Sequence, residues 1–342
     1  MRAGLRVTVT GGAGFIGSNL VGTLLRNPAI GKLTVIDDCS TGNTRSLGTD
    51  LTEVDFRLGS VLDADLLNQA VARADVVVHL AALGSVPRSM LAPLNSHHAN
   101  ATGTLHVLEA ARNGGAPLVV AASSSSVYGA QPQLPRVEDS RPMPVSPYAV
   151  TKLASEAYLS AYHASFGLEV LPLRFFNVYG PRQRAGHPYA AVVPRFIDAA
   201  LSGQPLCVHG TGTQSRDLTC VDTVCQVITT AIIDRVSSPW PVNLALGTRT
   251  TVLELIDVLA ELLDVAIEIE HVAPRPGDVA HSQSDPTRLR DLFPGITAVP
   301  LRDGLARTIA WHRQQRANSH DLAAGPSASS TRPHTQGRPC TS

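Results

Sequence analysis

The chain has little of several features that would place it in particular classes of protein. Only five of its 342 residues are cysteines, and no two of them form a CxxC pair. We therefore expect reduced thiols rather than a disulfide framework. The twelve histidines show no HxxxH or HExxH spacing, so no metal site is expected. The formal net charge is zero, which gives no electrostatic reason to expect nucleic acid or a membrane surface as a partner.

Long hydrophobic runs are also missing. No apolar stretch approaches the roughly 20 residues that a membrane-spanning helix needs. Residues 1–6 lead directly into a glycine-rich turn and show no pattern of a signal peptide, so we expect a cytoplasmic protein. The segment from 317 to 342 is rich in Pro, Ser and Thr and predicts a disordered tail.

What the chain does contain is an alternation of strand and helix patterns. Short β-branched runs predict strands at 5–10, 33–36, 54–58, 75–80 and 117–122, with helices between them at 14–26, 63–72 and 94–113. A helix over 148–166 and a strand over 168–175 continue the pattern. Such alternation predicts an α/β fold with a doubly wound parallel sheet, of the Rossmann kind.

After residue 180 the pattern loosens. Helices are predicted at 192–201, 221–233 and 252–263, with shorter elements between them. We expect a first domain over 1–180 and a smaller α/β lobe over 181–316, with some later segments returning to the first domain.

A glycine-rich turn follows the first predicted strand and leads directly into a helix. Gly11 permits the tight turn, Gly14 lets the backbone approach a pyrophosphate, and Gly17 allows close packing of helix on strand. The helix N-terminus offers free N–H groups to phosphate. A glycine turn without a ligand is the alternative, but the strand–turn–helix context favours a dinucleotide.

Two carboxylates, Asp37 and Asp38, end the second predicted strand. A carboxylate there can accept hydrogen bonds from an adenosine ribose and would repel a 2′-phosphate, which favours NAD over NADP. Arg45, nearby, could instead accommodate that phosphate, and a polar strand end without a ligand is the simpler reading.

Tyr148 and Lys152 lie four residues apart at the start of a predicted helix, with Pro147 in its first turn. The spacing places both on one helical face. An adjacent ammonium and a positive nicotinamide ring would lower the pKa of the phenol, allowing it to take a proton from a sugar hydroxyl. Ser124, at the end of a predicted strand, could assist by hydrogen bonding. Taken alone, such a pair is usually a surface contact.

The motifs GGAGFIG, IDD, HLAAL, SSSSVYG, SPYAVTK and RFFNVYGPRQ together resemble the extended short-chain dehydrogenases/reductases of the NAD-dependent epimerase/dehydratase type. The UDP-hexose 4-epimerases are the most similar group, and the likeness runs from about Val7 to Trp311. It implies that Tyr148 is the base, that Lys152 lowers its pKa and holds the nicotinamide ribose, and that Ser124 assists. It also implies a homodimer, with helices over 94–113 and 148–166 at the seam.

The resemblance further implies two sets of contacts. The cofactor, NAD, would contact Gly11, Gly14, Phe15, Ile16, Gly17, Asp37, Asp38, Ser60, Val61, Leu80, Ala81, Ala82, Asn100, Tyr148 and Lys152. A UDP-sugar would contact Ser85, Arg88, Ser124, Ser125, Tyr148, Asn177, Gln183, Val193, Arg216, Arg275, Asp278 and Ser282.

Four positions bear on the reaction, the substrate and the cofactor. Dehydratases of this group carry Asp-Glu where this chain has Ser125 and Ser126, and a hydroxyl cannot act as a general acid or base near neutral pH, which favours epimerisation. Epimerases restricted to plain UDP-hexoses carry a bulky Tyr where this chain has Ser282, which favours UDP-GlcNAc and UDP-GalNAc. Ser60 departs from the usual Asp that contacts adenine.

Three alternatives stay open: an epimerase of a UDP-hexuronate or another modified UDP-sugar, a dehydratase or simple reductase, and a non-enzymatic NAD-binding module.

Overall fold

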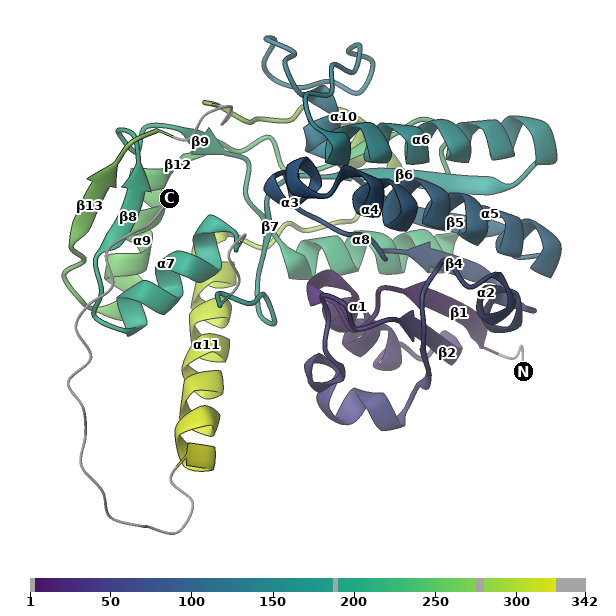
Figure 1. The fold of residues 1–342 in the computed structure, drawn as a ribbon, viewed down its shortest axis with the longest axis horizontal. Helices are drawn as coiled ribbons and strands as arrows, with labels where there is room; N and C mark the ends of the chain where they lie inside the picture. Colours follow the sequence, from purple (N-terminus) through teal and green to yellow (C-terminus); the bar gives the residue numbers. More distant parts are fainter. Residues whose placement is uncertain (1–3, 187–189, 275–279, 324–342) are drawn as a thin grey trace.

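The computed structural model describes residues 4–186, 190–274 and 280–323. A seven-stranded sheet forms the centre of the molecule (Figure 1). Every pair of neighbouring strands is parallel. The strands, in their order across the sheet, are β11 (Val242–Leu244), β6 (Glu169–Phe175), β5 (Leu118–Ser124), β4 (Val76–His79), β1 (Leu5–Thr10), β2 (Ile30–Asp37) and β3 (Asp55–Leu58). The predicted doubly wound parallel sheet is therefore confirmed.

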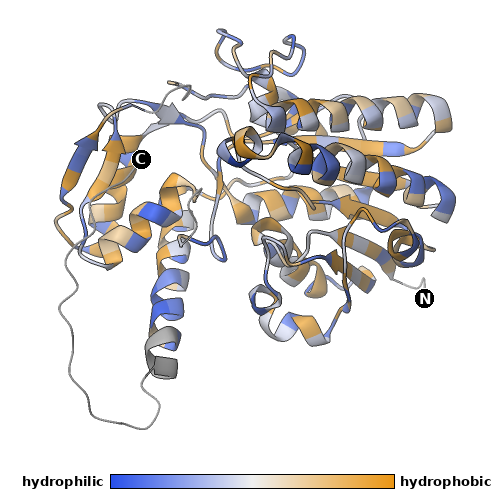
Figure 2. Ribbon diagram, viewed as in Figure 1, coloured by the Kyte–Doolittle hydropathy of each residue, from blue (hydrophilic) through white to orange (hydrophobic). Residues whose placement is uncertain are grey.

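Helices cover both faces of this sheet. On one face lie α1 (Phe15–Leu25) and α8 (Val221–Asp234), and on the other α2 (Ala64–Val71), α5 (Gly103–Gly114) and α6 (Pro147–Phe166). The residues of strand β4 are apolar without alternation because both faces of the strand are buried. Val76 and Val78 pack into the first layer and Val77 into the second. Each buried valine contributes roughly 1.5–3 kcal/mol. Hydrophobic residues predominate in the inner strands β4, β5 and β6, as the orange colour in Figure 2 shows.

Most predicted elements are present within a few residues of their expected ends, and α7 (Val192–Leu201) and α9 (Val252–Leu263) match them residue for residue. The single helix expected over 94–113 is instead divided into α4 (Pro93–His97), a π-helical turn η3 (His98–Thr102) and α5. The expected loop after residue 82 contains a short helix, α3 (Val86–Leu91).

A lobe beside the sheet has its own hydrophobic core, which includes Phe196, Leu206, Leu259 and Leu305. It contains short strand pairs and the helices α7, α9 and α11 (Leu301–Ala323). The parallel pairs are β8 (Leu206–His209) with β13 (Ile269–Val272) and β7 (Val178–Tyr179) with β10 (Thr219–Cys220); the antiparallel pair is β9 (Ser215–Arg216) with β12 (Thr250–Thr251). Helix α8 and strand β11 come after residue 180 but belong to the sheet layers.

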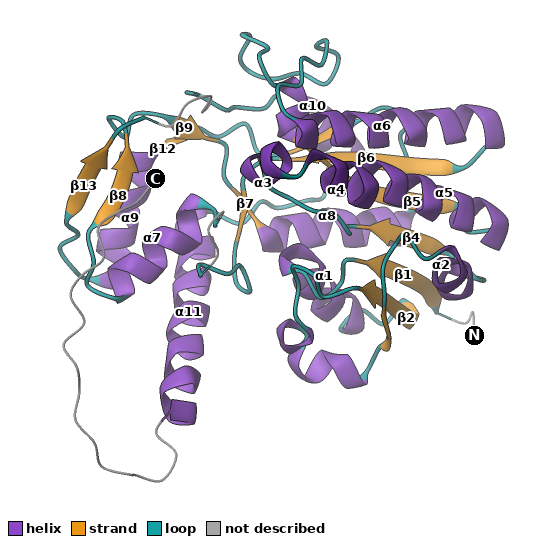
Figure 3. Cartoon of the chain, viewed as in Figure 1, coloured by secondary structure: helices purple, strands orange, loops and turns teal. Residues whose placement is uncertain are grey.

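Four shorter elements complete the described chain: η1 (Thr44–Ser46), η2 (Gly48–Thr52), η4 (Ser125–Tyr128) and α10 (Thr287–Leu292). The long loop over 129–146 projects beside α10 (Figure 3), where Arg288 on α10 forms an ion pair with Asp139 at 2.8 Å.

Two expectations need correction. Residues 317–323 were expected in a disordered tail, but helix α11 continues through them and ends at Ala323. Residues 324–342 lie outside the described part. Reduced thiols are present at Cys39, Cys220 and Cys225, whereas Cys207 is disulfide-bonded. Among the described residues, no helix is long and apolar enough to cross a membrane, and no cluster of side chains could hold a metal ion.

Candidate active site

A cleft of about 440 Å³ opens where β1 ends and α1 begins. Gly11 there has a φ of +73°, and a Cβ atom on it would lie 2.6 Å from the backbone nitrogen of Ala81. A Cβ on Gly17 would overlap the carbonyl oxygen of Gly11. Gly14, the N-cap of α1, supplies no capping side chain, so backbone N–H groups in the first turn remain available to an anion. Only glycine fits at positions 11 and 17, and the backbone of this turn suits a pyrophosphate.

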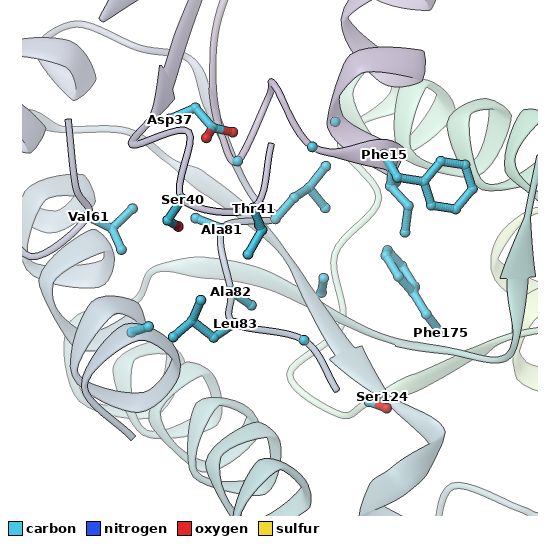
Figure 4. Close-up of a pocket in the computed structure, with 18 of the residues that line it drawn as sticks. Phe15, Asp37, Ser40, Thr41, Val61, Ala81, Ala82, Leu83, Ser124 and Phe175 are labelled. Carbon is cyan, nitrogen blue, oxygen red and sulfur yellow. The ribbon is translucent and has the colours of Figure 1, made fainter. Parts of the chain in front are cut away.

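Asp37 lies at one end of the same cleft, at the carboxyl end of β2 (Figure 4). Its carboxylate accepts hydrogen bonds from the backbone nitrogens of Ala13 at 2.9 Å and Cys39 at 2.8 Å. Burial raises the pKa of Asp37 above its ordinary value, while these backbone bonds oppose the rise. Asp38 also lines the cleft, and its carboxylate accepts from the nitrogen of Ser40. The bonds to Ala13 and Cys39 hold the Asp37 carboxylate in one orientation beside the glycine turn.

The remaining walls of the cleft come from the start of α1 and from the segments that follow β3 and β4. They include the predicted cofactor residues Phe15, Ile16, Ser60, Val61, Leu80, Ala81 and Ala82. Asn100 is not among the lining residues: it is fully buried in η3, where its amide bonds both backbone polar groups of Leu83 and the hydroxyl of Thr151. It therefore holds the wall in place.

Tyr148, Lys152 and Ser124 meet at the other end of the cleft, which they all line. Tyr148 lies in the first turn of α6, where the side chain of Ser146 caps the helix by accepting from the nitrogen of Ala149 at 3.2 Å. The Tyr148 hydroxyl is hydrogen-bonded with Ser124 at the end of β5. Lys152, one turn further on, is 5% exposed and donates from Nζ to the carbonyl of Ala122 at 2.8 Å.

Burial dominates the pKa values of this group. It raises the pKa of the Tyr148 phenol, and the hydrogen bond with Ser124 only offsets part of that rise. Burial also lowers the pKa of Lys152 to about 8, against the opposing charge of Glu156. The phenol pKa is therefore raised in the protein alone, and the expected lowering involves the positive nicotinamide ring as well as Lys152.

A second cleft, of about 590 Å³, adjoins the first and shares Asn177 and Val178 with it. Four predicted substrate residues, Ser85, Asn177, Val193 and Arg216, line it, and a fifth, Gln183, lines the first cleft. Reasoning from sequence missed further lining residues of both clefts, which carry no recognised motif: Ser40, Thr41, Arg195, Phe196, His209, Gln214 and Val252. Phe175 was also missed, although it lies inside a quoted motif and lines the first cleft (Figure 4).

Other predicted substrate residues line neither cleft. Ser125 begins η4, and Arg88 is half-buried in α3. Ser282 is half-buried, and its backbone nitrogen donates to the carbonyl of Ser215 at 3.0 Å. Arg275 and Asp278 lie outside the described residues.

A parallel sheet of this order, with a glycine turn on α1 and a Tyr–Lys pair on α6 beside a serine, defines an extended short-chain dehydrogenase/reductase. A profile of the NAD dependent epimerase/dehydratase family matches residues 7–245. The chain belongs to this family, and NAD is accordingly its cofactor. The residues around the cleft suit NAD, because Gly11 and Gly17 leave the space that its pyrophosphate needs and Asp37 lies where its ribose would be.

Curated and solved relatives extend over nearly the whole chain. A UDP-glucose 4-epimerase of Mycolicibacterium smegmatis is 37% identical, covering 91% of this chain and 99% of its own. The structure of UDP-N-acetylglucosamine 4-epimerase from Methanobrevibacter ruminantium in complex with UDP-N-acetylmuramic acid is 35% identical, with a TM-score of 0.86 over 91% of this chain and 99% of its own. A UDP-glucuronic acid 4-epimerase from Bacillus cereus, solved with NAD, is 30% identical, with a TM-score of 0.81 over 91% and 100%.

Proposed function

We propose that the protein catalyses the C4 epimerisation of a UDP-sugar, interconverting UDP-GlcNAc and UDP-GalNAc. The observation that carries the proposal is the meeting of Tyr148, Ser124 and Lys152 in the first cleft, which shares Asn177 and Val178 with the second. A nicotinamide in the first cleft and a sugar in the second would both contact this group. The named activities of the relatives above support the same reaction.

In this mechanism the Tyr148 oxygen takes the proton of the sugar 4-hydroxyl. NAD, which Gly11, Gly17 and Asp37 would hold in the first cleft, would supply reversible hydride transfer at C4. Ser124 bonds the Tyr148 oxygen and is placed to bond the 4-hydroxyl as well, so it orients the proton transfer. Lys152 donates to Ala122 and presents its charge below the phenol, which favours the phenolate once the cleft is filled. Tyr148 would then return the proton to the oxygen on C4, which completes the cycle with no net oxidation or reduction.

Elimination of water is disfavoured by the groups beside this centre. Ser125 and Ser126 occupy positions where a dehydratase would need an acid and a base, and the Ser126 hydroxyl is buried without a hydrogen-bond partner. A hydroxyl cannot supply or remove the proton that elimination requires near neutral pH. We therefore propose that the keto-sugar is reduced again rather than dehydrated.

The rest of the substrate would be held by the lobe. Arg216 and Asn177, which line the second cleft, would bind the UDP moiety, together with Arg275 and Asp278. Guanidinium groups suit a pyrophosphate, and a carboxylate suits ribose hydroxyls. The contacts with the sugar and nucleotide would be completed by Gln183, Val193, Ser85, Arg88 and Ser125. The small side chain of Ser282 leaves room for a 2-acetamido group.

A UDP-hexuronate is the second candidate substrate. The observation that favours it is the uronic acid epimerase among the solved relatives. Comparative turnover of the acetylated, plain and uronic sugars separates the two candidates.

The experiment that tests the reaction is NMR of UDP-GlcNAc incubated with the purified protein and no added reductant. We expect UDP-GalNAc to form without net NADH. A product that has lost an oxygen would establish elimination instead.

Substrate choice is tested by Ser282→Tyr, with Ser237→Tyr in an exposed loop as the control. Turnover of the acetylated sugar should fall in the first variant and persist in the second. Unchanged turnover of UDP-GlcNAc by Ser282→Tyr would contradict the argument from side-chain volume.

We also propose a cytoplasmic homodimer formed through α5 and α6. Apolar side chains are exposed along this side, among them Leu94 at 71%, Val150 at 51% and Phe166 at 55%. Light scattering after gel filtration measures the mass directly, and a monomer at micromolar concentration would contradict the proposal.

A further inference from the structure

The carboxylate of Asp217 is completely buried and joins two distant segments of the lobe. Its two oxygens accept from the backbone nitrogen of Gly247 at 3.0 Å, the hydroxyl of Thr248 at 3.0 Å and, more weakly, the nitrogen of Leu246 at 3.4 Å. They also accept from the nitrogen of Ser284 at 3.1 Å and its hydroxyl at 2.7 Å. Each of these donors is uncharged, so the carboxylate acts as an acceptor for the backbone rather than as half of an ion pair.

The segment that contains Ser284, residues 280–285, is held on two sides, by the lobe and by the loop over 129–146. On one side Ser215 forms a parallel bridge with His281, through bonds from Ser215 N to Ala280 O and from Ser282 N to Ser215 O, both 3.0 Å. On the other side the backbone nitrogen of Arg136 donates to the carbonyl of Gln283 at 2.8 Å. The position of Ser282 is therefore set by its pairing with β9 and by the anchoring of Ser284, two residues later, on Asp217.

Asp217 is also connected to the second cleft. Its neighbour in the chain, Arg216, lines that cleft, and its own carbonyl oxygen accepts from the Asn177 side chain at 3.1 Å. Through these bonds Asp217 links the positions of Arg216, Asn177 and Ser282. All three are residues that the proposed function assigns to substrate binding.

We infer that Asp217 is a positioning residue for the nucleotide sugar: through Ser284 and Gly247 it fixes residues 280–285 relative to Arg216 and Asn177. It thereby sets both the affinity for the substrate and the discrimination exerted at Ser282. The inference rests on the proposed function for the identity of the substrate. Its chemical basis is that a carboxylate only accepts hydrogen bonds, whereas an amide in the same place would turn an NH₂ group toward N–H and O–H donors.

The test is Asp217→Asn, assayed on UDP-GlcNAc and UDP-glucose. We expect KM for the sugar nucleotide to rise about tenfold and kcat to change less than about threefold. The preference between the two sugars should shrink about fivefold, because Ser282 is no longer held. The Kd for NAD should stay the same within about twofold, since none of the groups that donate to the Asp217 carboxylate lines the cofactor cleft.

Two further variants make the result specific. Ser284→Ala removes one donor, leaves Asp217 in place and should shift KM in the same direction by about threefold. Asp222→Asn, five residues away on α8 and paired there with Arg307, is the matched control and should change none of these quantities. A parallel fall of kcat, NAD affinity and thermal stability in Asp217→Asn would show a purely structural role and overturn the inference, as would an unchanged KM.

Hydrogen exchange separates this inference from the proposed function. In Asp217→Asn the amides of residues 280–285 and 246–248 should exchange about tenfold faster, with those of α6 unchanged. Unchanged exchange at 280–285 would overturn the positioning role. Absence of turnover on every UDP-sugar by the wild-type protein would instead overturn the proposed function, while leaving the exchange measurement valid.

Discussion

The cofactor cleft is lined largely by residues at or just after the carboxyl ends of the parallel strands of the main sheet, whereas the second cleft is lined by residues on helices, loops and the short strand pairs of the lobe. Asp37 ends β2 and Ser124 ends β5, so the backbone hydrogen bonds of the sheet fix the position of each of these residues. Arg216 belongs to a strand of two residues, and Ser282 to a segment with no regular structure. Their positions depend on side-chain hydrogen bonds, above all those of Asp217.

This difference teaches where each half should be sensitive to substitution. The cofactor half depends on backbone geometry, as at Gly11, where a Cβ atom would meet the chain after β4. The lobe depends on a small number of buried polar groups, whose loss leaves donors unsatisfied. The predictions below therefore separate effects on chemistry and cofactor from effects on substrate.

The largest effect is expected for Tyr148→Phe. Removing the hydroxyl removes the proposed base and its bond with Ser124 while keeping the ring, so kcat should fall by about 10²–10⁴-fold with NAD affinity retained. Tyr158→Phe, on the same helix and 38% exposed, is the control. Steady-state kinetics and NAD titration measure the two quantities. More than about a tenth of wild-type kcat in Tyr148→Phe would contradict the assignment of the base.

A second prediction concerns acid stability of the sheet domain. His79 is 4% exposed and bonded to Thr10 at 2.8 Å and Thr104 at 3.1 Å, and burial lowers its pKa from 6.5 to about 3. The unfolded chain therefore binds more protons than the folded one between these values. The stabilisation is complete above about pH 6.5 and is lost progressively as the pH falls toward 3; from pH 7 to 5 this removes about 2 kcal/mol of the free energy of unfolding.

Urea unfolding at pH 7 and pH 5 checks this expectation. His79→Gln should be less stable at pH 7 and should lose less stability on acidification than the wild type, whereas the exposed His97→Gln should behave as the wild type does. His312, whose pKa burial also lowers, contributes in the same direction and remains in all three proteins. An equal loss in wild type and His79→Gln would show that His79 is not responsible.

The third prediction tests cofactor choice. Asp37→Ser removes the negative charge beside the glycine turn, so the preference for NAD over NADP should fall about tenfold in the ratio of dissociation constants. Fluorescence titration with both cofactors measures it. Asp65→Asn, exposed on α2, is the control for charge alone. An unchanged ratio would assign the discrimination to another residue, such as Asp38.

The sequence alone predicted the cofactor half well because its determinants are local. A strand, a glycine turn and a helix follow one another within about 20 residues, and their pattern predicts both the element and the ligand. Fifteen cofactor-contact residues in all were named from the resemblance or the motif, and of these only Asn100 lies behind the wall of the cleft rather than on it.

The lobe was less predictable because its contacts join residues far apart in the chain. Asp217 contacts Gly247, 30 residues away, and Ser284, 67 residues away, and no spacing in the sequence shows this. Arg195 and His209 line the second cleft without belonging to any motif. The direction of the Tyr148 pKa was also unpredictable, since it depends on how completely the folded chain removes water from the phenol.

The smallest effect is expected at Ser60, which lines the cofactor cleft at the position where the resemblance implies an aspartate. Its hydroxyl accepts from the nitrogen of Leu62 at 3.2 Å, and its carbonyl accepts from the nitrogen of Asp63 at 3.1 Å. In Ser60→Asp a carboxylate oxygen can keep the bond to Leu62 and leave a second oxygen for an adenine amino group. We expect NAD affinity to rise about threefold, the worth of one exposed hydrogen bond. Ser60→Ala, which loses the bond to Leu62, is the matched comparison and should bind NAD more weakly than the wild type. Equal affinities in all three proteins would show that adenine is held by the apolar wall around Val61 and Ala81 rather than by residue 60.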